Sequence, residues 1–292
     1  MLKSMYSGIS GMKSNQTKMD VVGNNIANSS TTAFKKSSVR FSDTLNKTVI
    51  YSSQPSKNVG GVNPGHVGIG VKVSSIAKNM LQGSLQQTGI PSDLSIDGEG
   101  FFIAQIDKSN KGKDENIITE GYTRDGSFTL DKDGHLVTSA GYYILNTVNE
   151  PVNIPTVVDK NGDAVKEGTE GSKRVLSYNI SREGRISYVV EDGTKVDSSQ
   201  TLKIATFVNK NGLEPSSGNI YLESSNSGAP EYNIGDNKTK HGLITQGALE
   251  MSNVDLSEEF TDMIVTTRAF QASSKVITTS DELLQEIINL KR

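Results

Sequence analysis

The chain contains no cysteine and no tryptophan in 292 residues, and only three histidines. The lack of cysteine excludes disulfides, thiol chemistry and thiolate metal sites. His66, His135 and His241 lie far apart, without companions at the spacing of metal ligands. Neither a Gly-x-Ser-x-Gly motif nor a phosphate-binding loop is present. The sequence therefore predicts no catalytic residue, no metal site and no cofactor, and a protein that is not an enzyme.

Long apolar runs and a strong charge excess are also missing. No stretch of 18 apolar residues exists, which excludes a transmembrane helix. The net charge of −3 and the sequence pI of about 5.7 give no electrostatic attraction to nucleic acid or to an anionic membrane. The first residues include Lys3, but they form neither a continuous apolar segment nor a small-residue cleavage site. We therefore expect no nucleic-acid partner, no membrane partner and no cleaved signal peptide.

Both ends of the chain have the pattern of amphipathic helices, over 1–28 and 247–292. Apolar residues recur there at steps of four and three, which places them on one helix face. Gln16 and Gly23 interrupt the first stripe, and polar residues interrupt the second. The predicted self-assembly core consists of Met5, Ile9, Met12, Met19 and Ile26 in the first helix, and Leu256, Phe260, Met263, Phe270, Ile277, Leu284 and Ile288 in the second.

The two ends carry opposite charge. Residues 1–47 have seven cations and two acids, whereas residues 250–292 have eight acids and four cations. Opposite signs on two heptad helices favour pairing of the N-terminal helix with the C-terminal one. The alternative is two ordinary surface helices on a globular core. We expect a coiled-coil domain formed by 1–50 and 247–292.

The region between the helices has the pattern of strands and turns. Residues 51–70 are rich in Gly, Ser, Asn and Pro, which predicts a linker or extended arm. Over 71–246, strand-like segments alternate with Asp-Gly and Asn-Gly pairs, which suit tight turns. Residues 159–174 are charged and lack a large apolar side chain, so we expect an exposed loop. The predicted fold is a mainly β body of antiparallel sheets, with N- and C-terminal α-helices pairing as a coiled coil.

Several segments, in order along nearly the whole chain, resemble those of bacterial flagellar rod and hook proteins. They are NNIANSSTTAFKK (24–36), DLSIDGEGFF (93–102), YTRDGSFTLDKDGHLV (122–137), LKIATFVNKNGLEPSSGNIYLESSNSGAP (202–230) and GALEMSNVDLSEEFTDMIVTTRAF (247–270). The signature residues are Asn24, Asn25, Ile26, Ala27, Asn28, Phe34 and Lys35. Within the family, both ends look most like the short hook proteins of Gram-positive bacteria.

This resemblance implies a structural subunit of the flagellar hook, a helical tube of identical copies that acts as a flexible universal joint between rod and filament. The terminal helices would line its channel. The implied partners are other copies, neighbouring rod and hook–filament junction proteins, the hook cap and the type III export apparatus. The implied location is the flagellar hook or basal body, outside the cell after export. The family's export motif pairs two Phe four residues apart, and this chain offers Phe41 with Leu45 in that place.

Two alternatives remain. The distal rod protein of the flagellar basal body is a straight, stiff shaft with nearly the same motifs; the GALEMSNVDLS segment and the INLKR ending favour the hook over it. A secreted β-domain adhesin would need an exposed groove lined by aromatic residues, and an aromatic content of 6% gives it little support. Larger hook proteins carry a further outer β domain, whereas Pro151 to Leu202 leaves room here for only a few strands.

Overall fold

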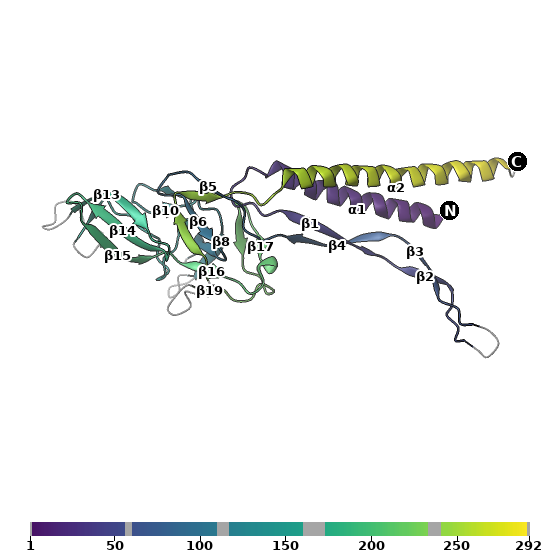
Figure 1. The fold of residues 1–292 in the computed structure, drawn as a ribbon, viewed down its shortest axis with the longest axis horizontal. Coiled ribbons are helices and arrows are strands. Elements are labelled where there is room, and N and C mark those ends of the chain that lie inside the picture. The colour runs from purple at the N-terminus through teal and green to yellow at the C-terminus, as the bar shows by residue number, and fades with distance from the viewer. Residues whose placement is uncertain (1, 56–59, 110–116, 160–172, 233–240, 291–292) are drawn as a thin grey trace. The chain divides into compact units, whose positions relative to one another are not determined.

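A computed structural model describes residues 2–55, 60–109, 117–159, 173–232 and 241–290 (Figure 1). The chain forms two compact units. Unit 1 comprises Met1–Ser29, Lys36–Asn79 and Val254–Arg292, and unit 2 comprises Ser30–Lys35 and Met80–Asn253. The predicted fold class is confirmed, because most elements are antiparallel strands and the N- and C-terminal helices pack together. Within the described residues, no helix is long and apolar enough to cross a membrane.

Unit 1 contains two long helices and two strand pairs. Helix α1 (Leu2–Ala27) and helix α2 (Leu256–Leu290) run antiparallel (Figure 1). Asp255 begins α2 as an N-cap, since its Oδ1 accepts a hydrogen bond of 2.8 Å from the backbone N–H of Ser257. Strand β1 (Ser37–Asp43) pairs with β4 (Val71–Lys78), and β2 (Asn46–Ile50) pairs with β3 (Gly65–Gly68).

The segment expected to be a linker belongs in part to this second strand pair. Strand β3 lies inside 51–70, and Ser53 and Val62 form a further bridge. Strands β1 and β2 thus pair in turn with β4 and β3, as the two sides of a ribbon. Sequence patterns missed it because most side chains of β2 and β3 are exposed, so no alternation of apolar and polar residues marks the strands.

The boundaries of the two units also differ from the expected domain limits. Strand β4 pairs with β1 and therefore belongs to unit 1, so unit 2 resumes at Met80 instead of residue 71. Strand β21 (Ala248–Glu250) pairs with β5 (Leu85–Gln87) in unit 2, so the helical part resumes at Val254 instead of residue 247. In both places backbone pairing decides the boundary.

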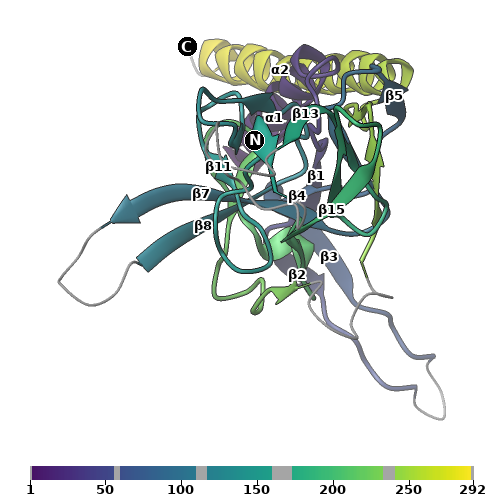
Figure 2. The ribbon, with the colours of Figure 1, turned by 90° about the vertical axis from the view of Figure 1, so that its left-hand side faces the viewer.

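Unit 2 is built from antiparallel sheets. Its largest sheet has the order β17 (Glu214–Pro215), β18 (Ile220–Leu222), β8 (Ile117–Thr123), β7 (Phe101–Ser109), β11 (Tyr143–Ile144), β10 (Leu136–Val137) and β9 (Thr129–Leu130), with β16 (Ile204–Thr206) pairing β7 and β19 (Glu231–Tyr232). Strands β7 and β8 form a long hairpin (Figure 2). Strand β6 (Leu94–Asp97) pairs with β20 (Leu243–Gln246). Helix η1 (Lys210–Gly212) is a single 3₁₀ turn.

A four-stranded sheet of β12 (Val157–Val158), β13 (Lys173–Ile180), β14 (Arg185–Val190) and β15 (Lys195–Thr201) occupies the middle of the chain. Its Ile186 and Tyr188 are buried in the same apolar cluster as Phe102 and Leu136 of the large sheet. The sheet therefore shares the core of unit 2 and forms no separate domain. Of the expected loop at 159–174, residues 160–172 lie outside the described residues, whereas Lys173 and Arg174 begin β13.

The glycines of the Asp-Gly dipeptides are required for two different structural reasons. Gly98, Gly134 and Gly193 have φ values of +112°, +82° and +72°, which favour glycine. Gly126 is required for another reason, since a Cβ atom there would lie 1.5 Å from the Leu94 carbonyl oxygen. The Asp-Gly pairs therefore mark both tight turns and a place where two backbones approach closely.

Candidate assembly interface

Helices α1 and α2 meet along a seam of small and polar residues. Ser4 Oγ lies 3.4 Å from Ser280 Oγ. A Cβ atom on Gly8 would lie 3.0 Å from Ile277 Cγ1 and 3.2 Å from the Ser273 carbonyl oxygen, and one on Gly11 would lie 3.0 Å from Ser273 Oγ. These distances show that the two helices approach closely at both glycines, where a larger side chain would crowd its neighbours.

The seam on α1 lies one residue before the predicted apolar stripe. Ser4, Gly8, Gly11, Lys18 and Asn25 contact α2. They precede Met5, Ile9, Met12, Met19 and Ile26, of which Ile9 is exposed and the other four are half-buried. Within one chain, the helix pairing therefore uses the small and polar residues beside the predicted stripe, and the role of the stripe in self-assembly stays a prediction.

On α2 the predicted stripe divides into two groups. Met263, Phe270, Ile277 and Leu284 are half-buried and share the seam spacing with the buried residues Glu259, Thr266 and Ser280. In contrast, Leu256, Phe260 and Ile288 are exposed, with Phe260 at 50%. A single chain thus pairs its two helices and still leaves large apolar side chains of α2 accessible to other molecules. The role of these residues in self-assembly stays a prediction.

The opposite charges of the two ends meet within one chain. Lys18 Nζ lies 3.2 Å from Asp262 Oδ2, and Lys36 Nζ lies 2.6 Å from Glu258 Oε2. The hydrogen bond to Glu258 raises the pKa of Lys36 above its ordinary value. Exposed pairs of this kind add about 0 to 1 kcal/mol each. These ion pairs therefore help to specify which ends of the helices meet, but they add little to the free energy of unfolding.

Asn25, one of the family signature residues, has a structural role at the end of α1. It is buried, and its Nδ2 donates hydrogen bonds to Glu259 Oε2 at 3.1 Å and to the Ser37 carbonyl oxygen at 2.9 Å, while its Oδ1 accepts one from Ser37 N at 3.0 Å. A single buried asparagine in a helical seam specifies register. Asn25 therefore fixes the end of α1 against both α2 and the start of β1.

The neighbouring signature residues close α1. Asn28 Nδ2 donates hydrogen bonds to the Asn24 carbonyl oxygen at 2.9 Å and to Asn24 Oδ1 at 3.0 Å. Ile26 and Phe34 are half-buried, whereas Ala27 is exposed. The local bonds of Asn24 and Asn28 therefore end the helix where the chain passes into unit 2.

Lys35 belongs to a buried ionic cluster in unit 2. Its Nζ lies 2.5 Å from Glu250 Oε1 and 2.8 Å from the Leu81 carbonyl oxygen, while Arg124 Nη1 lies 3.3 Å and 3.2 Å from the two Glu250 oxygens. Lys35, Glu250 and Arg124 are 1%, 1% and 5% exposed. Burial lowers the pKa of Lys35, and Glu250 opposes that shift. The cluster therefore joins three segments that the sequence showed only separately.

Sequence reasoning did not single out Arg124 and Glu250. Both stand inside the segments YTRDG and GALEM, where a charged residue accompanies apolar and small neighbours. Such a charge is a weak signal of a buried pair, and Lys35 is distant from both residues in sequence. Only the fold shows that one carboxylate serves two cations.

The two candidate export residues are accessible in unit 1. Phe41 lies in β1 and is 40% exposed, and Leu45 is 70% exposed. Their side chains could therefore be recognised without unfolding this part of the chain. Their role in export stays a prediction.

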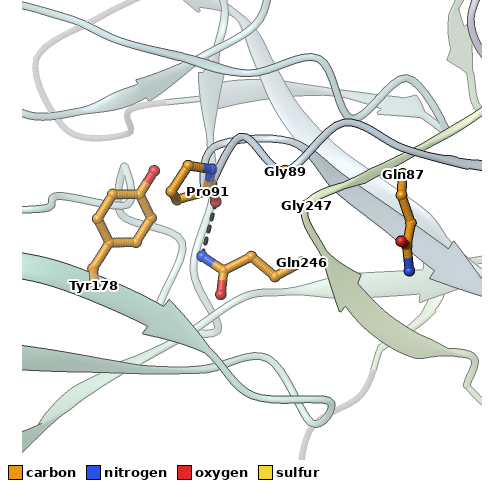
Figure 3. Close-up of a pocket in the computed structure, with 6 residues that line it drawn as sticks. All are labelled: Gln87, Gly89, Pro91, Tyr178, Gln246 and Gly247. Atoms are coloured by element: carbon orange, nitrogen blue, oxygen red, sulfur yellow. Dashed lines mark hydrogen bonds between the residues drawn. The ribbon is translucent and has the colours of Figure 1, made fainter.

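Within the described parts of the chain, the structure shows a surface hollow in unit 2 but no cluster of metal-ligating side chains. No group of three or more His, Asp or Glu side chains there could hold a metal ion. A hollow of about 370 Å³ is lined by Gln87, Gly89, Pro91, Tyr178, Gln246 and Gly247 (Figure 3). Gln246 donates a hydrogen bond of 2.8 Å to the Pro91 carbonyl oxygen and accepts one of 3.1 Å from Ile180 N. Its amide is thus committed to the fold, and no lining residue is charged.

Three models of known protein families match this chain, and the matched ranges follow the two helical ends and the β-rich unit 2. The family model for the flagella basal body rod protein matches residues 5–35, that for the flagellar hook protein FlgE/F/G D1 domain matches 95–188, and that for the flagellar basal body rod FlgEFG protein C-terminal matches 245–290. The first and last of these cover most of the two terminal helices, and the second covers much of unit 2.

Relatives match over the whole chain. The flagellar basal-body rod protein FlgG of Bacillus subtilis is 44% identical over 294 residues, covering 100% of both chains. FlgG of Buchnera aphidicola subsp. Acyrthosiphon pisum is 36% identical, covering 99% of this chain and 100% of that one. The flagellar hook protein FlgE of Borreliella burgdorferi is 29% identical over 454 positions, with both chains fully covered.

A solved structure of the Helicobacter pylori flagellar hook protein FlgE2 shares 13% identity at a TM-score of 0.25, over 68% of this chain and 48% of that one. Full-length identity of 44% to a flagellar axial protein decides the assignment. Proteins of this kind are structural components of the flagellar hook or basal body. The chain belongs to the bacterial flagellar rod and hook protein family.

Proposed function

We propose that this chain is the distal rod subunit of the bacterial flagellum and that copies of it assemble into a straight, stiff tube. The proposal rests on the length of this chain compared with the lengths of its rod and hook relatives. The 44% identical relative named as a rod protein matches end to end, whereas alignment with the hook protein FlgE of Borreliella burgdorferi extends over 454 positions against 292 residues here. Local motifs at the start of α2 favoured the hook. The 44% identity and equal length of the rod relative support the rod instead.

The exposed faces of α2 support assembly from identical copies. Leu256, Phe260 and Ile264 recur at steps of four and are all exposed. Val265 and Val276 are exposed on a different face. Two apolar faces beside the seam suit contacts with two neighbours, and repeated contacts between unlike surfaces generate a helical assembly. Burying them would add about 25 cal/mol for each Å² of apolar surface removed from water.

Export and flagellar neighbours belong to the same proposal. The subunit would leave the cell through the type III export apparatus, with Phe41 and Leu45 as its recognised side chains, both of which are exposed. Its neighbours in the flagellum would be other rod subunits and the hook. If the chain were a hook subunit instead, its neighbours would be the rod, the hook cap and the hook–filament junction proteins.

Deletion of this protein separates the two functions. Basal bodies purified from the deletion strain should end short of a complete rod and carry no hook. A complete rod without a hook would contradict the rod assignment and support the hook. Reintroduction of the wild-type protein is the control, and should restore rod, hook and filament together. Electron microscopy of the purified basal bodies reads out each case.

A further inference from the structure

The buried cluster of unit 2 contains unequal numbers of positive and negative charges. The Glu250 carboxylate accepts hydrogen bonds from Lys35 Nζ, Arg124 Nη1 and the backbone N–H of Gly83. Among the described residues, Lys35 and Arg124 form ion pairs with no other carboxylate. Glu99 carries an exposed carboxylate that pairs with Lys210 instead. One buried anion thus compensates two buried cations.

Glu250 also contacts the Ser30–Lys35 segment through its backbone. Its carbonyl oxygen accepts a hydrogen bond of 2.8 Å from Ala33 N, and the next residue, Met251, donates one of 2.9 Å to the Ser84 carbonyl oxygen. The Ser30–Lys35 segment is the part of unit 2 that comes from the N-terminal region of the chain. Ala33 and Lys35 of this segment therefore both contact Glu250, which lies close in sequence to the C-terminal helix, while the Thr32 carbonyl oxygen accepts a hydrogen bond of 2.8 Å from Asn219 Nδ2.

Removal of the carboxylate would leave two cations in a site that excludes water. Arg124 keeps Nε at 3.0 Å from the Gly100 carbonyl oxygen and Nη2 on that of Gly98, so its guanidinium stays in place. A second buried cation beside it is unfavourable unless an anion lies between them. Lys35 can therefore enter only together with Glu250.

We propose that Glu250 is the closing residue of unit 2: the Ser30–Lys35 segment docks only when the chain through Glu250 has folded. Lys35 and Arg124 are positioning residues that make docking depend on this one carboxylate. Unit 2 thus completes its folding only after the chain through Glu250 is present. In a chain that ends before Glu250, the Ser30–Lys35 segment stays undocked. The inference holds for a rod and for a hook subunit alike.

Hydrogen exchange of the full-length protein tests this order. The variants are Glu250→Gln, Lys35→Met and the double variant, with Lys36→Met as the control. The nearer partner of Lys36 is the exposed Glu258 at 2.6 Å, and the buried Glu259 lies farther away at 4.0 Å. Glu250→Gln should speed exchange in 30–35 at least tenfold. Lys35→Met should act less, because it leaves one cation with one carboxylate. The control should leave exchange in 30–35 unchanged.

The double variant gives the decisive comparison. Lys35→Met should reverse part of the effect of Glu250→Gln, because one of the two uncompensated cations is then gone. Unchanged exchange in Glu250→Gln, equal effects of the two single variants, or no recovery in the double variant would overturn the proposal. If Glu250→Gln does not fold at all, recovery of folding in the double variant supports the proposal, and failure to recover contradicts it.

Discussion

Alanine substitutions at three glycines of α1 test whether the helices pair within one chain along the observed seam. All three positions lie in α1 and receive the same substitution, but the atoms around the added Cβ atom differ. A Cβ atom on Gly23 would meet nothing within 4 Å, one on Gly11 would meet only the Ser273 side chain at 3.0 to 3.7 Å, and one on Gly8 would meet both Ile277 and the Ser273 backbone.

The expected magnitudes follow from two opposing effects. Replacing glycine by alanine inside a helix stabilises it by about 1 kcal/mol. Crowding a close-packed contact costs about 1 to 3 kcal/mol. Gly23→Ala should therefore raise the free energy of unfolding by about 1 kcal/mol, whereas Gly8→Ala should leave it unchanged or lower it by up to about 2 kcal/mol. Gly11→Ala should fall between them, because a serine side chain can rotate away.

Urea unfolding monitored by circular dichroism at 222 nm measures the difference. In the described residues the two α-helices both belong to unit 1, so the helical signal reports on that unit. The chain should be kept dilute, with size-exclusion chromatography showing a monomer. Equal stabilisation by Gly8→Ala and Gly23→Ala would refute the seam, because it would mean that no neighbour lies against Gly8 in the monomer.

Three further predictions concern assembly, pH and export. Phe260→Asp should abolish polymer formation, followed by light scattering, while the monomer keeps its circular dichroism spectrum, because the side chain is exposed in one chain; Lys132→Asp is the matched control, and normal polymers of the Phe260 variant would count against the interface. Burial raises the pKa of Tyr221 to about 12, so the stability that this group contributes is present below about pH 10 and lost as the pH rises to 12. Urea unfolding at pH 10, 11 and 12 should show a smaller loss for Tyr221→Phe than for the wild type, and identical losses would contradict it. The double variant Phe41→Ser, Leu45→Ser should accumulate inside the cell in folded form, as immunoblots of cell and medium fractions would show, and wild-type amounts in the medium would exclude both residues from export.

The sequence predicted the helices but not how they pair. Steps of four and three residues identify a helix face irrespective of residue size, so both terminal helices could be found. Hydrophobicity selected Met5 and Ile9, whereas the contacts between the two helices involve Ser4 and Gly8. Small residues at heptad spacing are the signal that hydrophobicity overlooks, because their contribution is the close approach that they allow.

Long-range ionic contacts were beyond prediction for a different reason. Lys35 and Glu250 are separated by 215 positions, and nothing in either local segment names the other. Resemblance to known segments identified Lys35 as a signature residue without a role. The paired ribbon of β2 and β3 was missed because its exposed strands need no apolar face. Turn chemistry, in contrast, acts locally, and Gly98, Gly134 and Gly193 could be predicted as turn residues.

An electron cryomicroscopy structure of the tube assembled from the purified full-length chain would test the central claim most directly. That claim is that each chain pairs its own terminal helices through small residues and keeps its larger apolar side chains for its neighbours. The map should show a straight tube in which Gly8 lies against Ser273 of the same chain and Phe260 is covered by another copy. A tube in which α1 pairs with α2 of a different copy, or in which Phe260 remains open to solvent, would contradict the account.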